Sequence, residues 1–302
     1  DVDTVTNVET LSFDDGDIGV SHDGTGLVLT GQSADNIEVV GSVGVTVLGE
    51  AGNDVLTGGS GGDDLSGGDG DDTLIGGSGS DVIDGGFDHD VAVFAGHQGD
   101  YTFASSEDGL TVTVTQRYTG DVDTVTNVET LSFDDGDIAV SHDGTGLVLV
   151  GQSADSIEVV GSVGVTVLGQ EDNDTLTGGS GSDTIDGGDG SDFIAGGDGA
   201  DAIMGGAGSD TIDGGSGIDH IMGGAGSDTI DGGLGSDFID GGDGNDTIGG
   251  GDGSDSILGG LGSDTIDGGS GGDNVDGGDG NDAIDGGDGS DFIAGGDGAD
   301  AI

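Results

Sequence analysis

Single apolar residues recur at intervals of nine through the second half of the chain, each between polar neighbours. Residues 178–294 read as thirteen consecutive nonapeptides of the form G-G-x-G-x-D-x-U-x, where U is apolar, and an eight-residue partial copy follows. A looser unit at 169–177 has Leu176 at position eight, and the later units have Ile there, except for Val275. One apolar residue between two polar ones predicts a short strand that turns only its central side chain toward a core.

Strands of three residues are too short to be stable alone, but stacked copies form a parallel sheet with a spacing of about 4.8 Å. Two successive nonapeptides, eighteen residues, can form one coil of strand, turn, strand and turn. Ile is β-branched and suits such a pleated surface, and glycine adopts the backbone angles that tight turns need. The pattern therefore predicts an all-β parallel solenoid with a thin core between two facing sheets.

Position six is Asp in all fifteen units counted from residue 169. In an eighteen-residue coil, Asp192 neighbours Asp210 on one edge, and Asp201 neighbours Asp219 on the other. Two carboxylates about 5 Å apart repel by about 3 kcal/mol at an effective dielectric constant near 20. A hard divalent cation between them would remove this repulsion, because carboxylate and carbonyl oxygens are its preferred ligands.

A second, shorter array of five nonapeptides lies upstream at 49–93. There is also a larger repeat with a period of 120, since residues 1–50 and 121–170 differ at only four positions. We interpret the chain as a fragment of a longer tandem-repeat protein. The predicted organisation is a partial β-rich connecting module at 1–48 (repeated at 121–168), a first roll at 49–93, a connecting module at 94–168 and a second roll at 169–302.

The segments between the arrays also show strand patterns. Residues 101–118 alternate around an Asp-Gly pair, which predicts a β-hairpin. Residues 31–40 resemble a worn nonapeptide with Asp35 and Ile37 in register, and the next nine residues keep a strand but have no Asp. Either the solenoid continues here through coils without metal, or these segments form a separate small β-domain.

The charge of the chain is extreme. It contains 63 acidic residues against a single basic one, Arg117, and its formal net charge is −62. Such a chain has no basic surface for nucleic acid or for anionic membranes. No apolar run approaches the roughly 20 residues of a membrane span, no signal peptide is visible at the N-terminus, and Cys is absent. We expect compaction only where cations neutralise the carboxylates.

The nonapeptide resembles that of the RTX (repeats-in-toxin) family over twenty units. The resemblance implies a right-handed parallel β-roll with Ca²⁺ in the turns, bound by turn carbonyls and the position-six Asp. It also implies type I secretion of an unfolded chain, which folds outside the cell. The implied ligands, for about sixteen Ca²⁺, are Asp54, Asp63, Asp72, Asp81, Asp183, Asp192, Asp201, Asp210, Asp219, Asp228, Asp237, Asp246, Asp255, Asp264, Asp273, Asp282, Asp291 and Asp300.

Two further position-six residues stay outside this set because their units depart from the pattern. The unit of Asp90 has Asp88 in place of the third glycine, and the unit of Asp174 lacks two of the three glycines.

Other motifs give little evidence of chemistry. The five His residues lack metalloprotease spacing, and no G-x-S-x-G motif occurs. We therefore expect no enzyme activity from this chain. Thr211, Thr229, Thr247 and Thr265 recur every eighteen residues and predict a column on one face, beside a column rich in Asp. Phe193, Phe238 and Phe292 share the same position of the unit, so they should point outward and could make lateral contacts.

Three classes of function fit these observations. The first is a calcium-dependent extracellular structural protein at a bacterial cell surface, such as an adhesin stalk, a surface layer or a matrix fibre that self-associates. The second is the C-terminal secretion and folding region of a secreted toxin or hydrolase. The third is an ice-binding solenoid, which the Asp column beside the Thr column disfavours. Near-identical 120-residue modules favour the first.

Overall fold

The computed structural model describes residues 10–12, 17–22, 26–142 and 146–302. The chain divides into two compact units, 1–141 and 142–302. Among the described residues the secondary structure is almost entirely β, with one short 3₁₀ turn, η1 (Gln98–Asp100), and no α-helix.

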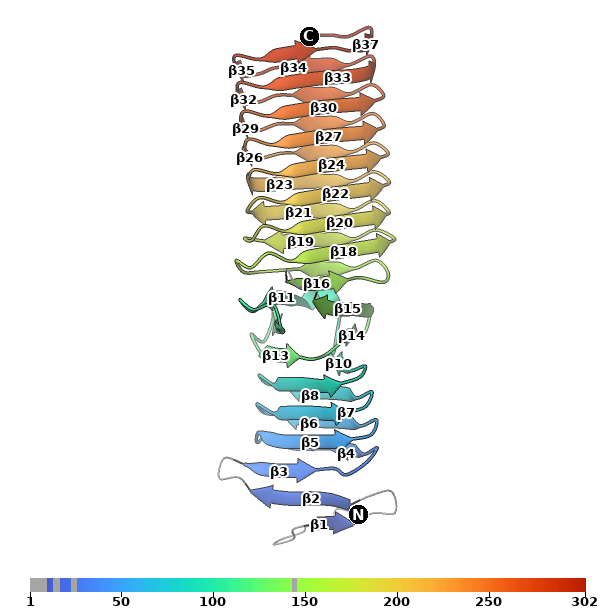
Figure 1. Ribbon diagram of the computed structural model, residues 1–302, viewed down its shortest axis with the longest axis vertical. Helices are drawn as coiled ribbons and strands as arrows, with labels where there is room; N and C mark the ends of the chain where they lie inside the picture. The colour runs from blue at the N-terminus through green and yellow to red at the C-terminus, as the bar shows by residue number, and fades with distance from the viewer. Residues whose placement is uncertain (1–9, 13–16, 23–25, 143–145) are drawn as a thin grey trace. The chain divides into compact units, whose positions relative to one another are not determined.

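The second unit consists of coils whose strands alternate between two parallel sheets (Figure 1, green to red). The first sheet contains β16 (Leu147–Val150), β18 (Thr166–Glu171), β20 (Thr184–Asp189), β22 (Ala202–Ala207), β24 (His220–Ala225), β27 (Phe238–Asp243), β30 (Ser256–Leu261), β33 (Asn274–Gly280), β36 (Phe292–Ala294) and β37 (Asp297–Gly298). The second contains β17 (Ser156–Glu158), β19 (Thr175–Gly179), β21 (Phe193–Asp198), β23 (Thr211–Gly217), β25 (Thr229–Asp231), β26 (Leu234–Gly235), β28 (Thr247–Gly249), β29 (Asp252–Gly253), β31 (Thr265–Asp267), β32 (Ser270–Gly271), β34 (Ala283–Asp285) and β35 (Asp288–Gly289).

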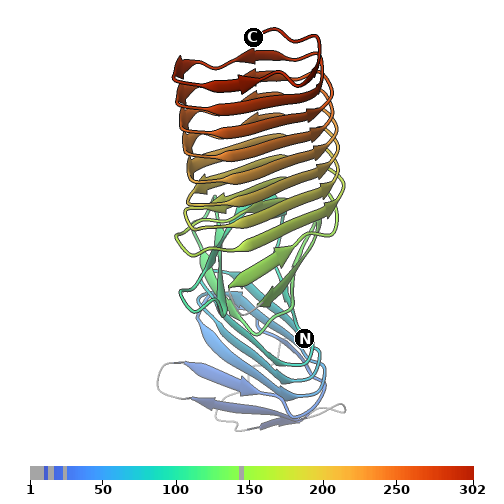
Figure 2. The same cartoon turned by 45° about the horizontal axis from the view of Figure 1, so that its top comes forward.

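Every strand pairs with the strand one coil away. Ile185 pairs with Ile203 in the first sheet, and Ile194 pairs with Ile212 in the second, both in parallel register. The two sheets face each other across the coil, as the tilted view in Figure 2 shows. This confirms the parallel β-solenoid and its eighteen-residue coil.

The core is the predicted column of position-eight side chains. From Leu176 to Ile284 each is at most 5% exposed, and Ile194 and Leu176 are fully buried. Burying one such side chain contributes about 1.5–3 kcal/mol. Stability therefore accumulates coil by coil rather than from one central cluster.

The strands extend further than the three residues expected from the sequence. In β20 and β22, pairing skips the first glycine of the turn and resumes with Gly188 opposite Gly206 and Asp189 opposite Ala207. The carbonyl and N–H groups of the glycine-rich segment thus take part in the backbone hydrogen bonds of the sheet, because no side chain keeps the two backbones apart.

The middle of the first unit has the same parallel coils, and antiparallel strand pairs flank them. One sheet contains β1 (Thr10–Ser12), β2 (Asp17–His22), β3 (Leu27–Thr30), β5 (Val45–Ala51), β7 (Asp64–Asp69), β9 (Val82–Phe87), β13 (Val122–Thr126), β12 (Thr111–Gln116) and β11 (Tyr101–Ser105), in that order. The facing strands are β4 (Asn36–Glu38), β6 (Val55–Ser60), β8 (Thr73–Ser78), β10 (Val91–Val93), β14 (Thr130–Phe133) and β15 (Gly136–His142).

The segment at 31–48, which resembles a degenerate nonapeptide and the strand after it, belongs to the solenoid rather than to a separate fold. Ile37 of β4 pairs with Leu56, and β3, β5 and β7 pair in parallel in succession. The strands β5 and β18 run without a break through residues 48 and 168, where the sequence suggests module boundaries. Those boundaries stay predictions about how the chain is organised.

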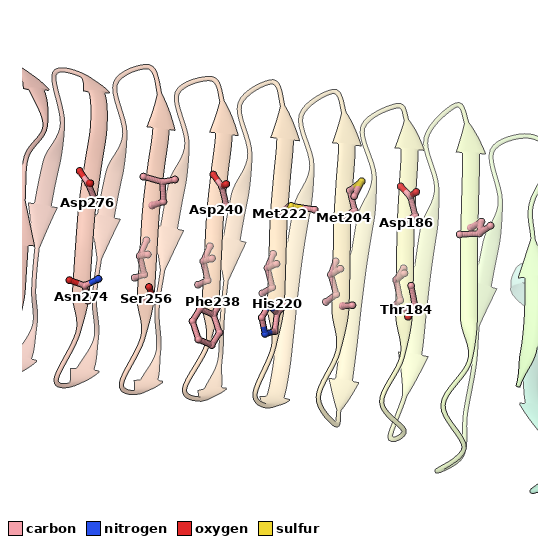
Figure 3. Close-up of a pocket in the computed structure, with 18 residues that line it drawn as sticks. Thr184, Asp186, Met204, His220, Met222, Phe238, Asp240, Ser256, Asn274 and Asp276 are labelled. Carbon is pink, nitrogen blue, oxygen red and sulfur yellow. The ribbon is translucent and has the colours of Figure 1, made fainter. Parts of the chain in front are cut away.

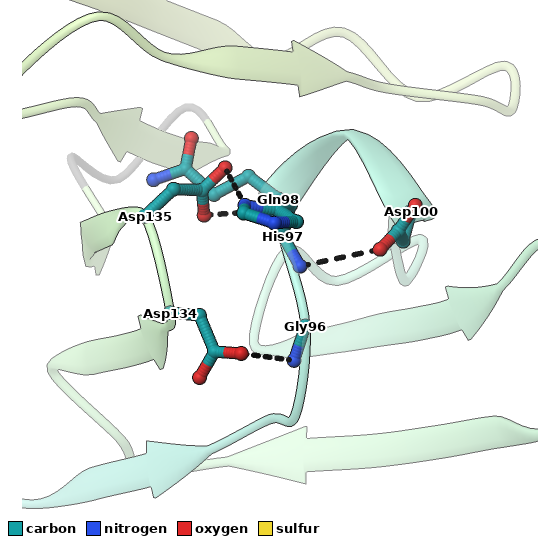
Figure 4. Close-up of polar contacts among 6 residues, drawn as sticks. All are labelled: Gly96, His97, Gln98, Asp100, Asp134 and Asp135. Carbon is teal, nitrogen blue, oxygen red and sulfur yellow. Dashed lines mark hydrogen bonds and ion pairs between the residues drawn. The ribbon is translucent and has the colours of Figure 1, made fainter.

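The hairpin predicted for residues 101–118 is formed by β11 and β12. Strands β11 and β12 are antiparallel, with Phe103 opposite Val114, and β12 then pairs with β13. Phe94, Tyr101 and Phe133 pack together with ring centroids 5.3–5.7 Å apart. Figure 4 shows how the β14–β15 turn is tied to this segment, since Asp134 accepts the Gly96 N–H and Asp135 accepts the Gln98 N–H.

A matched pair of glycine substitutions tests the close coil stacking. Gly251 has φ +98°, and a Cβ added there would overlap the carbonyl oxygen of Gly233. Gly249 is the control, three residues after the turn aspartate Asp246. A Cβ added to Gly249 would have no neighbour closer than 3.8 Å. We expect Gly251→Ala to lower the free energy of unfolding in calcium by at least about 1–3 kcal/mol. Gly249→Ala should change it by less than about 0.5 kcal/mol. Equal urea midpoints for the two variants would contradict this packing.

Candidate metal sites in the turns

The position-six aspartates are buried, although they are charged residues. From Asp54 to Asp90 and from Asp174 to Asp282, each is at most 3% exposed. They follow the glycine-rich turns at the two edges of the coil and precede the strands that carry the core Ile. In the final coil, Asp291 and Asp300 are partly exposed. A charge is buried in proteins only where it is paired or coordinates a metal.

One carboxylate oxygen of each aspartate is bonded to the neighbouring coil. The Asp192 N–H donates to Asp210 Oδ1 at 2.9 Å, and the Asp201 N–H donates to Asp219 Oδ1 at 2.9 Å. The Asp192 carbonyl also accepts the Thr211 N–H at 2.8 Å. The aspartates one coil apart are therefore adjacent, as the eighteen-residue spacing predicts, and they form a continuous ladder along each edge.

The other carboxylate oxygen has no hydrogen-bond partner. This holds for Oδ2 of all the buried position-six aspartates, namely Asp54, Asp63, Asp72, Asp81, Asp90, Asp174, Asp183, Asp192, Asp201, Asp210, Asp219, Asp228, Asp237, Asp246, Asp255, Asp264, Asp273 and Asp282. An unsatisfied buried charged oxygen is costly. The same unpartnered oxygen recurs in each of these buried turns, which fits a cation as its partner.

The surroundings of this oxygen suit a hard cation. A Cβ added to Gly187 would meet both Asp192 Oδ2 and, at 2.6 Å, the carbonyl oxygen of Gly205 in the next coil. The glycine thus leaves room where two oxygens converge, and oxygen-only donors with negative charge are what Ca²⁺ binds. Among the described residues, no group of three or more His, Cys, Asp or Glu side chains could hold a metal. Backbone carbonyls would therefore have to complete the coordination.

Burial raises the pKa of these carboxyl groups. The pKa of Asp183, Asp210, Asp246 and Asp255 is raised from 3.8 to about 6, chiefly by desolvation, although the N–H of the preceding coil opposes the shift. Repulsion by the carboxylates one coil away adds to the effect of burial on Asp210. Without a cation, these carboxyl groups therefore hold their protons more tightly than a free aspartate does.

The two aspartates with imperfect units occupy the same position as the others. Asp90 Oδ1 accepts the Asp72 N–H at 2.8 Å, and Asp174 Oδ1 accepts the Asp155 N–H at 2.8 Å. Burial raises the pKa of both to about 6. The missing glycines do not displace these carboxylates from the ladder.

The sequence pattern did not reveal every carboxylate of the ladders. Asp123 Oδ1 accepts the Asp81 N–H, and Glu129 Oε2 accepts the Asp90 N–H, both at 2.8 Å. Both residues keep part of the nonapeptide pattern in the sequence, because each acid is followed by x-U-x. The glycines that precede the acid in a nonapeptide are absent. At the other end of the first array, Val45 stands in the place of an aspartate, and its N–H donates to Asp63 Oδ1.

The profile of the RTX calcium-binding nonapeptide repeat matches nine overlapping stretches within residues 46–92 and 168–302, more than half of the chain. The chain belongs to the RTX calcium-binding repeat family. Its matched stretches coincide with the coils that carry the aspartate ladders. A comparison with curated proteins gave no match.

Among solved structures, the RTX chain is similar to the extracellular lipase LipA from Serratia marcescens. The two are 21% identical with a TM-score of 0.32, and the alignment covers 66% of this chain and 33% of the lipase. The chain thus spans about a third of the lipase's length, and at this level of likeness the lipase's activity does not carry over.

The outer faces of the RTX coils differ from each other. On the first sheet, position nine carries Met204, Met222 and Leu258, and His220 stacks on Phe238 at 4.7 Å between ring centroids. Together with acidic side chains they line a shallow groove of about 570 Å³ (Figure 3). On the second sheet, Thr211, Thr229, Thr247 and Thr265 form the predicted column, beside Asp213, Asp231 and Asp267.

The three outward Phe residues are at least half exposed, with Phe193 on the second sheet and Phe238 and Phe292 on the first. The described part of the RTX chain also contains no helix long and apolar enough to cross a membrane.

Replacing one ladder aspartate should weaken the two sites that share it. Asp228→Asn keeps an oxygen for the Asp210 N–H but removes one charge between Asp210 and Asp246. We expect the affinity for calcium at these two sites to fall at least tenfold, which is about 1.4 kcal/mol. Asp213→Asn removes the same charge from the exposed outer face and should leave the calcium titration unchanged. Indistinguishable titrations of the two variants would refute the ladder as the binding element.

Calcium affinity should also depend on pH. A carboxyl whose pKa rises from 3.8 to about 6 on folding binds its proton more tightly when folded, so the calcium-free fold gains stability as the pH falls and loses it as the pH rises through about 6. Calcium must displace these protons. When the pH is lowered from about 7 to about 5, calorimetry should show that calcium binds more weakly and that its binding releases protons. Over the same change, circular dichroism in calcium-free buffer should show more β-structure. A pH-independent affinity would disprove the assignment.

Proposed function

We propose that this chain is part of a calcium-dependent extracellular structural protein, such as an adhesin stalk, a surface layer or a matrix fibre. The observation that carries the proposal is the buried, unpartnered Oδ2 in each complete coil. A chain with 63 acidic residues and this ladder is poorly stable without cations. With Ca²⁺ in the turns, the same ladder cross-links each coil to the next, and about sixteen such links follow from the pairing of aspartates.

Calcium concentration would then decide where the protein folds. A site that forms only in the folded state contributes its binding free energy to folding. Extracellular calcium modules bind at about 10⁻⁴–10⁻³ M, so the chain would stay unfolded in a low-calcium cytosol and fold after type I secretion. An unfolded chain is also what a narrow export channel requires.

The support for a structural rather than a catalytic role is the repetition itself. The coils from β18 to β33 follow one register, and each contributes the same core residue and the same carboxylate. A near-identical 50-residue segment also recurs after 120 residues, at 1–50 and 121–170, each time followed by nonapeptides. The exposed Phe238 and Phe292 lie on the face with Met204 and Met222, and we expect this face to mediate lateral contact between copies.

Electron microscopy of the full-length protein tests this role. In calcium, we expect elongated stalks, filaments or sheets, and chelation should disperse them and abolish the β-signal in circular dichroism. Mg²⁺ should restore both poorly, because it requires near-octahedral geometry and retains its waters.

Two other results would redirect the interpretation. Compact monodisperse particles in calcium would count against a structural role and favour a folding region of a secreted hydrolase or toxin. A native β-spectrum in calcium-free buffer at neutral pH would overturn calcium-coupled folding altogether.

A further inference from the structure

A cavity of about 490 Å³ lies in the first unit, between the turn Gly76–Gly79 and the hairpin β11–β12. Pockets of this size hold small molecules. Aliphatic and aromatic side chains form most of its wall, and three carboxylates, Asp121, Asp123 and Asp134, also line it. Within the described residues, no Lys, Arg or His is part of this lining. The cavity therefore combines an apolar wall with negative charge.

The aromatic part of the wall is held in place by contacts of its own. Phe94 is 7% exposed and Tyr101 is 4% exposed, and their ring centroids lie 5.7 Å apart in an edge-to-face arrangement. The Tyr101 hydroxyl donates to the Ala95 carbonyl at 2.7 Å, and Phe94 stacks on Phe133 with 5.4 Å between centroids. An apolar ligand would thus meet a preformed wall, and preorganisation reduces the cost of binding.

Asp123 is the most buried of the three carboxylates, and it is not enclosed in a calcium turn. It is 7% exposed, and its Oδ1 accepts the Asp81 N–H at 2.8 Å. In the regular turns, the first glycine lies against Oδ2 of the aspartate five residues later, as Gly76 lies against Asp81. Tyr118 stands in the place of that glycine before Asp123. Asp123 thus lines the cavity without the glycine that marks the calcium turns.

Asp121 and Asp134 bring further negative charge to the same cavity. Asp121 precedes β13 and is partly exposed, and Asp134 follows β14 and is exposed. The Asp134 carboxylate accepts the Gly96 N–H at 3.2 Å (Figure 4). A cation in the cavity would be attracted by all three carboxylates, and most strongly by Asp123, because solvent screens a buried charge least.

The lining discriminates between classes of ligand. An anion would be repelled by three carboxylates. A neutral apolar molecule would take water away from Asp123 without replacing its hydrogen bonds, which is costly for a buried charge. A metal ion needs several converging ligands, and the described residues contain no cluster of three or more His, Cys, Asp or Glu that could hold one. A cation with an apolar body is complementary to both parts of the wall.

We propose that this cavity binds a small organic ammonium ion, with the ammonium group against Asp123 and Asp121 and the apolar body against Phe94 and Tyr101. The ammonium N–H groups would donate charge-assisted hydrogen bonds to the carboxylates. The aromatic rings attract cations as well as apolar groups. This site goes beyond the structural role, because it requires the calcium-loaded fold but no contact between copies.

Isothermal titration calorimetry of the full chain in saturating calcium tests the site, with phenethylammonium as the probe. We expect a single site per chain with a dissociation constant of about 0.1–1 mM. Phenethyl alcohol has the same ring without the charge, and ethylammonium has the charge without the ring. Each should bind at least about tenfold more weakly than the probe. Phenylpropionate, which carries the opposite charge, should not bind.

Matched variants assign the charge that is recognised. Asp123→Asn keeps an acceptor for the Asp81 N–H but removes the buried charge, so it should weaken the binding of phenethylammonium at least about tenfold. The same variant should not weaken the binding of phenethyl alcohol. Asp121→Asn, at a more exposed carboxylate, should weaken the probe less. Asp213→Asn, on the exposed face of the second unit, should leave its affinity unchanged.

Diffuse attraction of amines to so acidic a chain is the alternative that these titrations exclude or establish. It would give many weak sites, equal affinities for ethylammonium and the probe, and unchanged affinity in both Asp123→Asn and Asp121→Asn. Any of these results would overturn the proposal. If Asp123→Asn fails to fold in calcium, the Asp121→Asn titration and the comparison with phenethyl alcohol still decide it. Compact particles in electron microscopy would contradict the structural role and leave this site standing.

Discussion

The buried carboxylate with one satisfied and one unsatisfied oxygen is the constraint on which this fold depends. Oδ1 of each position-six aspartate is committed to an N–H of the preceding coil, which fixes the side chain and brings the charges of successive coils together. Oδ2 then has no protein partner, as in Asp210 and Asp228. The hydrogen bond that stacks the coils also creates the electrostatic problem that a cation solves, so stacking and metal binding are one interaction.

Glycine and isoleucine follow from this constraint. Position one must be glycine because Oδ2 and a carbonyl of the next coil occupy the space of its side chain, as at Gly187. Position eight must be apolar and compact because the two sheets face each other across a single layer of side chains, as with Ile194. The remaining positions face solvent and vary, which is why one outer face carries Met204 and the other carries Thr211.

The coil and the regular sites could be predicted from the sequence because a strict period fixes which residues become neighbours. The eighteen-residue spacing was sufficient to place Asp192 beside Asp210. The ends of the first ladder could not be predicted in the same way. The pairing of Asp81 with Asp123 depends on how a hairpin of unknown path returns the chain to the coil, and hydrophobic alternation does not specify that return. The extension of strands into Gly188 also escaped prediction, since glycine ordinarily weakens a strand.

The alternation of successive units between the two sheets has a consequence for how such arrays can change in length. Adding or removing one nonapeptide would transfer every later unit to the opposite sheet. The Thr211 column and the Met222 face would then exchange sides beyond the change, and any surface that continues along the rod would be broken there. Changes of two nonapeptides leave each face continuous. Recombination within the array therefore preserves both surfaces only when it adds or removes whole coils of two nonapeptides. The core and the aspartate ladders would accept an odd number of nonapeptides as well as an even one.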